Sequence, residues 1–399
     1  QQCVHLNEVQ VIGSHNSYHL RSREPFWSAF SGFVPDIART LDYAHPPLPN
    51  QFSDQAVRQI ELDVATDPKG GRYATHRVLK VVNQPTKSTD PNLYKPGLKV
   101  IHEPEIDWET TCSTLRICLT QVRRWSQAHP NHVPIAVLLE LKEDPTPDPL
   151  ELGFVSAQPY TRKDLAELDA TIRSEIPRSM LFTPDDLRGS AKTLPAAIRT
   201  NGWPTLAEAR GKVLFLMDNE GSVRSLYLKG HENLAGRALF TSSKPGEPSA
   251  AFVKANDPTG LNGQRIAQLV RDGFVVRLHV EGGHGRAVRR VERALVGAQH
   301  HTVRPHDVFR HFHERPIWTD VEQHRRRSTG RCWTKPAPQG ITEVEAALAV
   351  GRDVVRRNQR NALVLIDERL THGGEHRDTR DVRLCPHKSS LRVVGQTDR

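Results

Sequence analysis

The segment Val9-Gln10-Val11-Ile12-Gly13-Ser14-His15-Asn16 decides how the rest of this 399-residue chain is interpreted. A short β-branched run that stops at a glycine predicts a buried strand. The polar residues after it lie past its carboxyl end, where parallel-sheet enzymes keep their chemistry. His15 supplies a titratable group and Asn16 a neutral oxygen ligand for a hard cation, so this strand end is a candidate catalytic corner.

A second apolar run, residues 59–64, carries acidic side chains. Its alternation places Glu61 and Asp63 on one face and the apolar residues on the other. In a strand that is buried on both faces, two carboxylates require a cation or a positive partner. A half-exposed strand with solvated carboxylates is the simpler alternative.

Two later runs end in the same way. Residues 98–101 lead into His102, and the apolar run 134–141 places Glu140 near its carboxyl end. His102 could instead be a structural residue, and Glu140 could form an ion pair with Lys142 on the same face of the strand.

If these strand ends meet, carboxylate and amide oxygens collect at one place and repel one another unless a divalent cation lies among them. An oxygen-only set suits calcium better than zinc. Two histidines beside that cation would form a general base and a general acid near neutral pH.

The order and spacing of these segments resemble the catalytic half of a phosphatidylinositol-specific phospholipase C, above all the secreted, calcium-dependent bacterial kind. The resemblance is strongest over residues 4–145 and thins out to about residue 276. It implies a (β/α)8 TIM-type barrel with Ca²⁺ at its mouth. By position, it implies that the calcium ligands are Asn16, Glu61, Asp63 and Glu140, and that the catalytic pair is His15 and His102.

The implied reaction is calcium-dependent cleavage of phosphatidylinositol to diacylglycerol and an inositol phosphate. His15 would act on the inositol 2-hydroxyl and His102 on the leaving oxygen, an assignment that follows from analogy. Whether the product is cyclic or linear is left open. Lys142 is a candidate for binding phosphate as well as a partner for Glu140, and Asp218 is a candidate substrate-side residue or a helix cap.

The C-terminal part is harder to interpret. We expect the barrel to span residues 1–310 and a basic region of uncertain fold to span 311–399. The last strand is expected either at 301–303 or at 362–366; the second choice makes residues 342–367 a helix-strand unit of the barrel. Two further possibilities are left open. The barrel could be distorted or incomplete at its C-terminal end, or the residues after Arg277 could come from a shifted reading frame, because the sequence there is rich in Arg, His and Gly.

Composition and cysteine content limit the class of protein and the compartment in which it is found. With 37% hydrophobic and 25% charged residues, the chain has no apolar run near the ~20 residues that a membrane span requires. The start at Gln1 rather than Met suggests a secreted chain whose signal peptide is removed. Cys112 and Cys118 could form a disulfide, as could Cys332 and Cys385, which leaves Cys3 over; buried free thiols are the alternative.

The net charge of +9 favours anionic partners, and 22 arginines and 11 of the 20 histidines lie from Arg277 onward. We expect a phosphoinositide substrate at a membrane surface, a monomer, and no nucleic-acid partner. Two other functions are kept: a glycerophosphodiester phosphodiesterase of the same barrel type, and a non-catalytic protein that binds polyanions or lipid surfaces through its basic tail.

Overall fold

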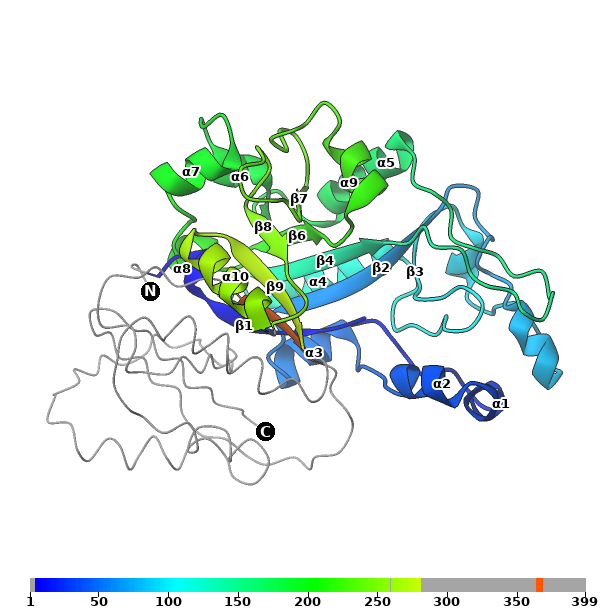
Figure 1. The fold of residues 1–399 in the computed structure, drawn as a ribbon. Coiled ribbons are helices and arrows are strands. Elements are labelled where there is room, and N and C mark those ends of the chain that lie inside the picture. The colour runs from blue at the N-terminus through cyan, green and yellow to red at the C-terminus, as the bar shows by residue number, and fades with distance from the viewer. Residues whose placement is uncertain (1–3, 259, 281–363, 369–399) are drawn as a thin grey trace, which may run out of the picture.

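The computed structural model describes residues 4–258, 260–280 and 364–368. Its centre is a parallel sheet that curls into a barrel (Figure 1). The chain follows the ring through β1 (Gln10–Ser14), β2 (Gln59–Asp67), β4 (Ile135–Leu141), β6 (Val213–Met217), β7 (Leu239–Thr241), β8 (Phe252–Lys254), β9 (Val275–Val280) and β10 (Val364–Glu368). The predicted (β/α)8 TIM-type barrel is therefore confirmed, in a distorted form.

The distortion lies opposite β1. The short strand β5 (Leu181–Phe182) and β7 both pair with β6, one beside each half of it. Beyond β7, the ring continues to β8 only through the parallel bridge Ser242 to Phe252 and the hydrogen bond from Ser243 N to Phe252 O, 3.0 Å.

The strand beside β1 comes from the C-terminal part of the chain. β10 pairs in parallel with β1, Gln10 opposite Val364, and with β9, Val276 opposite the same residue. Of the two positions expected for the last strand, the structure has this strand at the second. Residues 301–303, the helical part of 342–367 and nearly all of 311–399 lie outside the described residues, so the domain boundaries stay a prediction.

The run that leads to His102 is not a parallel barrel strand, as its similarity to the other strand ends had suggested. β3 (Gly97–Val100) pairs with β2 in the antiparallel direction, Val64 opposite Val100 and Asp67 opposite Gly97. β2 is nine residues long and continues past the point where its neighbour β1 ends, so its free second half accepts the returning chain. Ile101 N then reaches Asp63 O at 3.2 Å, which brings His102 back to the level of Asp63.

Helices surround the strands, with α5, α6, α7 and α9 along one side and α1 to α3 on another (Figure 1). In α4, Thr114 caps the first turn, and Leu115, Leu119 and Val122 are buried at helical spacing. In the described part of the chain, no helix is both long and apolar enough to span a bilayer. The helices are α1 (Phe26–Phe33), α2 (Pro35–Leu41), α3 (Leu48–Asp54), α4 (Leu115–Ala128), α5 (Arg162–Glu175), α6 (Pro184–Arg188), α7 (Leu194–Thr200), α8 (Leu206–Ala209), α9 (Gly221–Leu228) and α10 (Gly260–Arg271), with 3-10 turns η1 (Leu6–Glu8), η2 (Arg77–Val82) and η3 (Pro91–Tyr94).

Candidate active site

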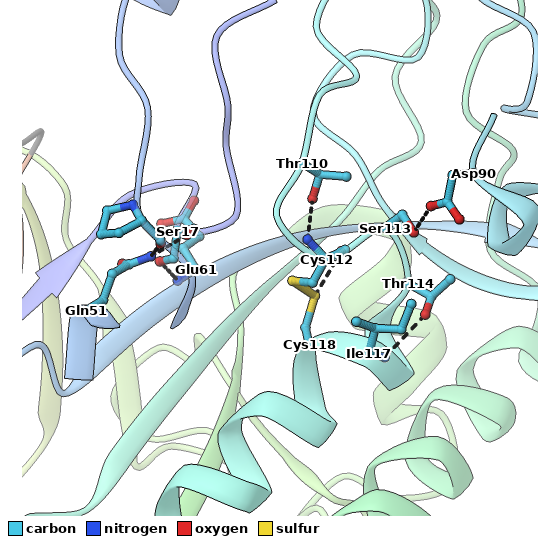
Figure 2. Close-up of a disulfide and its surroundings, with 11 residues drawn as sticks. Ser17, Gln51, Glu61, Asp90, Thr110, Cys112, Ser113, Thr114, Ile117 and Cys118 are labelled. Atoms are coloured by element: carbon cyan, nitrogen blue, oxygen red, sulfur yellow. Dashed lines mark hydrogen bonds between the residues drawn. A yellow bond between two sulfur atoms is a disulfide. The ribbon is translucent and has the colours of Figure 1, made fainter. Parts of the chain in front are cut away.

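The loop after β1 is fastened to β2 by Ser17. Its backbone N–H donates to Glu61 O at 2.9 Å, and its hydroxyl accepts from Glu61 N at 2.8 Å. Gln51 of α3 donates to Ser17 O at 2.6 Å from the other side (Figure 2). Between these contacts Asn16 adopts φ 45°, a left-handed conformation that asparagine tolerates better than most residues. The loop thus holds His15 and Asn16 at the carboxyl end of β1.

Glu61, Asp63 and Glu140 meet as predicted. Each offers an oxygen within 4.8 Å of the others, because β2 and β4 pair with Asp63 opposite Glu140. The exposed fraction is 2% for Glu61 and 0% for Asp63, which rules out the alternative of a solvated sheet face. Burial, together with the negative charge of Glu140, raises the pKa of Asp63 to about 8. A buried cluster of this kind calls for positive charge.

The donor set fits calcium. Among the described residues, neither Asp63 carboxylate oxygen has a hydrogen-bond partner, and the same is true of the buried Asn16 Oδ1. Buried polar atoms are rarely left unpaired unless an ion, water or ligand completes them. With the carboxylates of Glu61 and Glu140, these oxygens form a set of hard ligands of the type that calcium binds.

Two basic side chains supply positive charge. Lys142 Nζ lies 3.2 Å from Glu140 Oε1 and 3.5 Å from Asp63 Oδ2. Burial alone would lower the pKa of Lys142, but the charges of Asp63 and Glu140 raise it. The ion pair with Glu140, one of the two interpretations of Lys142, is therefore present.

The second basic residue, Arg277, was not identified from the sequence as part of the site. Its guanidinium is 1% exposed; Nη2 lies 2.5 Å from Glu61 Oε2, and Nη1 donates to Asn256 Oδ1, also at 2.5 Å. The only available signal was an arginine inside the apolar run 274–278, because a buried charge in such a run needs a partner.

The two histidines lie beside the carboxylate cluster. His15 Nδ1 is 3.3 Å from Glu61 Oε2, and its ring meets the ring of His279 edge to face at 4.6 Å. His102 Nδ1 contacts Asp107 Oδ2 at 2.7 Å. Although burial acts against it, the hydrogen bond to Asp107 and the charge of Asp63 raise the pKa of His102.

Asp107 is a further functional candidate that residue-by-residue reasoning did not single out. It is 2% exposed, and a turn in which Asp107 N donates to Glu103 O at 2.9 Å places it beside His102. Burial would raise the pKa of Asp107, but hydrogen bonds from His102 and His19 lower it. An acidic residue five positions after His102 carries no periodic signal, so only the turn reveals the pairing.

Asp218 follows β6 and faces the site rather than capping a helix. Its carboxylate lies 2.6 Å from Lys254 Nζ, and Glu220 occupies the N-cap position of α9. Burial and the negative charge of Glu61 raise the pKa of Asp218, so the two carboxylates sense one another.

The predicted disulfide between Cys112 and Cys118 is confirmed, with its Cα atoms 5.3 Å apart (Figure 2). It joins the segment that follows Asp107 to the first turn of α4. Cys3, Cys332 and Cys385 lie outside the described residues, so the second predicted pair stays a prediction.

A comparison with models of protein families gives one match. A sequence model described as "Phosphoinositide phospholipase C, Ca2+-dependent" matches residues 4–295. No curated protein sequence gives a significant match.

Similar solved structures include a Ca²⁺-dependent phosphatidylinositol-specific phospholipase C from Streptomyces antibioticus, with 19% identity, 74% of this chain and 92% of that chain covered, and a TM-score of 0.46. Another is the apo form of a calcium-dependent phosphoinositol-specific phospholipase C from a Pseudomonas species, with 20% identity, 69% of this chain and 83% of that chain covered, and a TM-score of 0.42. Because the family match spans most of the chain, the protein belongs to the Ca²⁺-dependent phosphoinositide phospholipase C family and is a calcium-dependent phosphodiesterase.

Proposed function

We propose that the protein cleaves phosphatidylinositol to diacylglycerol and an inositol phosphate, with His15 and His102 as general base and general acid. One observation carries the proposal: both histidines lie beside the carboxylate cluster. His15 contacts Glu61, and His102, which contacts Asp107, follows Ile101, whose N–H donates to Asp63 O. A metal ion with two titratable groups near it suits displacement at phosphorus.

Calcium would be held by Asn16, Glu61, Asp63 and Glu140. Asn16 Oδ1 and the carboxylate oxygens of Asp63 support this assignment, because they have no hydrogen-bond partner among the described residues. When bound, the ion would act as a Lewis acid that makes the inositol hydroxyl more acidic and neutralises charge on the phosphate oxygens.

The histidines would move the protons. His15 takes the proton of the inositol 2-hydroxyl, whose oxygen bonds to phosphorus as the bond from phosphorus to the glycerol oxygen breaks. His102 gives its proton to that leaving oxygen. The acid must be protonated near neutral pH, and the raised pKa of His102 supports this role. This sequence produces a cyclic phosphodiester, which a water molecule can then open to a linear phosphate.

The two remaining predicted residues, Lys142 and Asp218, would balance charge and help to bind the substrate. Lys142 contacts both Asp63 and Glu140, so we assign it to balancing their charge, with the substrate phosphate as a second partner. Asp218 pairs with Lys254 and would hold that ammonium near the site, where an anionic substrate can meet it.

The place where the enzyme acts follows from its substrate. Phosphatidylinositol lies in a bilayer, so the enzyme would act at a membrane surface, and we propose that it does so as a secreted monomer. The Cys112–Cys118 disulfide supports an oxidising compartment, where such bonds form and persist.

Phosphorus NMR of phosphatidylinositol vesicles tests the proposal. We expect an inositol phosphate signal in calcium, none in excess chelator, and a large loss of rate in His102→Ala. Free glycerol phosphate would instead indicate the glycerophosphodiester phosphodiesterase. Turnover that persists in chelator would remove the metal role, and full activity of His102→Ala would remove the general acid.

A further inference from the structure

One buried histidine has no task in the mechanism above. His19 is 0% exposed, and its Nε2 lies 2.9 Å from both carboxylate oxygens of Asp107. Asp107 Oδ2 also meets His102 Nδ1 at 2.7 Å. A single carboxylate is thus held between two imidazoles, one of them the proposed general acid.

Backbone pairing sets this arrangement. Residues 18–20 run antiparallel to residues 109–111, with a bridge from His19 to Thr110. Leu20 N donates to Glu109 O at 3.2 Å, and Thr111 N donates to Tyr18 O at 2.8 Å. The segment that follows β1 is therefore joined to the segment that follows Asp107, and the Cys112–Cys118 disulfide anchors the latter to α4.

The imidazole of His19 is also held on its face. The ring of Tyr43 stacks on it at 4.2 Å and 25°, and the Tyr43 hydroxyl accepts a hydrogen bond from Asn16 Nδ2 at 3.2 Å. In addition, His45 N donates to His19 O at 2.9 Å. The ring therefore has little freedom to turn away from Asp107.

Among the described residues, Asp107 is the only side chain that forms a hydrogen bond with the ring of His19. A carboxylate only accepts hydrogen bonds, so His19 Nε2 carries the hydrogen; the other ring nitrogen, Nδ1, has no hydrogen-bond partner among the described residues. For packing alone, an apolar residue of similar size would avoid burying a polar ring. What the imidazole provides is a donor aimed at Asp107.

The hydrogen bond from His19 restricts the rotation of the Asp107 carboxylate about χ2. The carboxylate of an aspartate turns about χ2 in a broad, roughly two-fold well. With His102 as its only partner, Asp107 could turn and take the ring of His102 with it. The second donor at His19 fixes the carboxylate plane, and the carboxylate in turn fixes the imidazole of His102.

We propose that His19 is a positioning residue for the general acid: through Asp107 it holds the His102 ring so that Nε2 points at the leaving oxygen. This inference rests on the proposed function, in which His102 protonates that oxygen. Partners one step removed from a reacting group change activity by about 10- to 100-fold in metal sites; His19 acts one step further away, through Asp107, so we expect a loss of about 10-fold.

The experiment compares two leaving groups. His19→Phe removes the donor but keeps the ring stacked on Tyr43, and His19→Gln restores an N–H that can reach Asp107. Each variant is assayed on phosphatidylinositol, whose alkoxide leaving group needs a proton, and on an inositol phosphodiester with a 4-nitrophenolate leaving group, which does not. We expect His19→Phe to lower kcat on the lipid about 10-fold at similar KM and to change the nitrophenyl rate little. His19→Gln should recover most of the loss.

His102→Ala separates this inference from the proposed function. If His102→Ala is equally slow on both substrates, the general acid is wrongly assigned and the role of His19 falls with it. If His102→Ala recovers on the nitrophenyl substrate but His19→Phe slows both reactions equally, the acid stands and His19 only supports packing. Melting curves accompany each assay, and His19→Leu replaces the phenylalanine variant if that one does not fold.

Discussion

Replacing Arg277 with methionine is expected to destabilise the calcium-free protein by about 3–5 kcal/mol, the usual cost of breaking a buried ion pair from one side. Arg277 is 1% exposed and Glu61 is 2% exposed, with Nη2 and Oε2 2.5 Å apart. At an effective dielectric constant near 20, two opposite unit charges attract each other by about 4 kcal/mol at about 4 Å and by more at shorter distances, so this ion pair can account for a loss of that size.

The measurement is the free energy of unfolding from urea titrations, made in excess chelator and in saturating calcium. In chelator, the variant leaves Glu61 buried beside Asp63 and Glu140 with less positive charge around it. In calcium, the ion supplies charge to the same carboxylates and stabilises the folded state by its binding free energy. We therefore expect the difference between variant and wild type to shrink when calcium is added.

Arg124→Met is the matched control, because Arg124 lies exposed on α4. Substitution at such a surface position changes stability by about 0.5 kcal/mol or less. If Arg277→Met loses no more stability in chelator than Arg124→Met, Arg277 is not the buried counter-ion of Glu61. If its loss is the same with and without calcium, the carboxylates that Arg277 neutralises are not the ones that bind the metal.

Three further outcomes are expected. Asp63→Asn should weaken calcium binding by about 10-fold or more in a calorimetric titration, since it removes one charged ligand from the cluster; unchanged affinity would place the ion elsewhere. Burial lowers the pKa of His132 to about 4, so the folded state holds its neutral form, and stability that is complete above the ordinary pKa near 6.5 is lost as the pH falls towards 4. The loss amounts to about 3 kcal/mol. When the free energy of unfolding is measured by urea titration at several pH values in this range, it should change less with pH in His132→Gln than in the wild type. Opening the Cys112–Cys118 loop in the double serine variant should cost about 2 kcal/mol of unfolding free energy, and a loss near zero would mean that the loop is ordered without it.

The ends of the barrel strands could be predicted from local pattern. Apolar runs that stop at Gly13 or carry acidic residues in alternation, as at Glu61 and Asp63, depend only on neighbours along the chain. Because parallel strands in a barrel end at one face, such runs bring their polar residues together whatever the connections between them. The carboxylate cluster of Glu61, Asp63 and Glu140 was predictable for this reason.

Pairing between distant segments could not be predicted in the same way. The antiparallel return of β3, which brings His102 beside Asp63, depends on how far β2 extends past β1. The strand that completes the ring next to β1 comes from residues 364–368; composition favoured this run over residues 301–303, but its distance along the chain from the preceding strands left both choices open.

The sequence by itself identified the candidate residues at the mouth of the barrel: the carboxylates, Asn16, and the histidines at positions 15 and 102. Only the tertiary structure decided which partners hold them. Arg277 meets Glu61 across 216 residues, and His19 meets Asp107 across 88. Such contacts leave no periodic trace in the chain, because they arise when packing excludes water and each buried charge must find a partner wherever the fold supplies one.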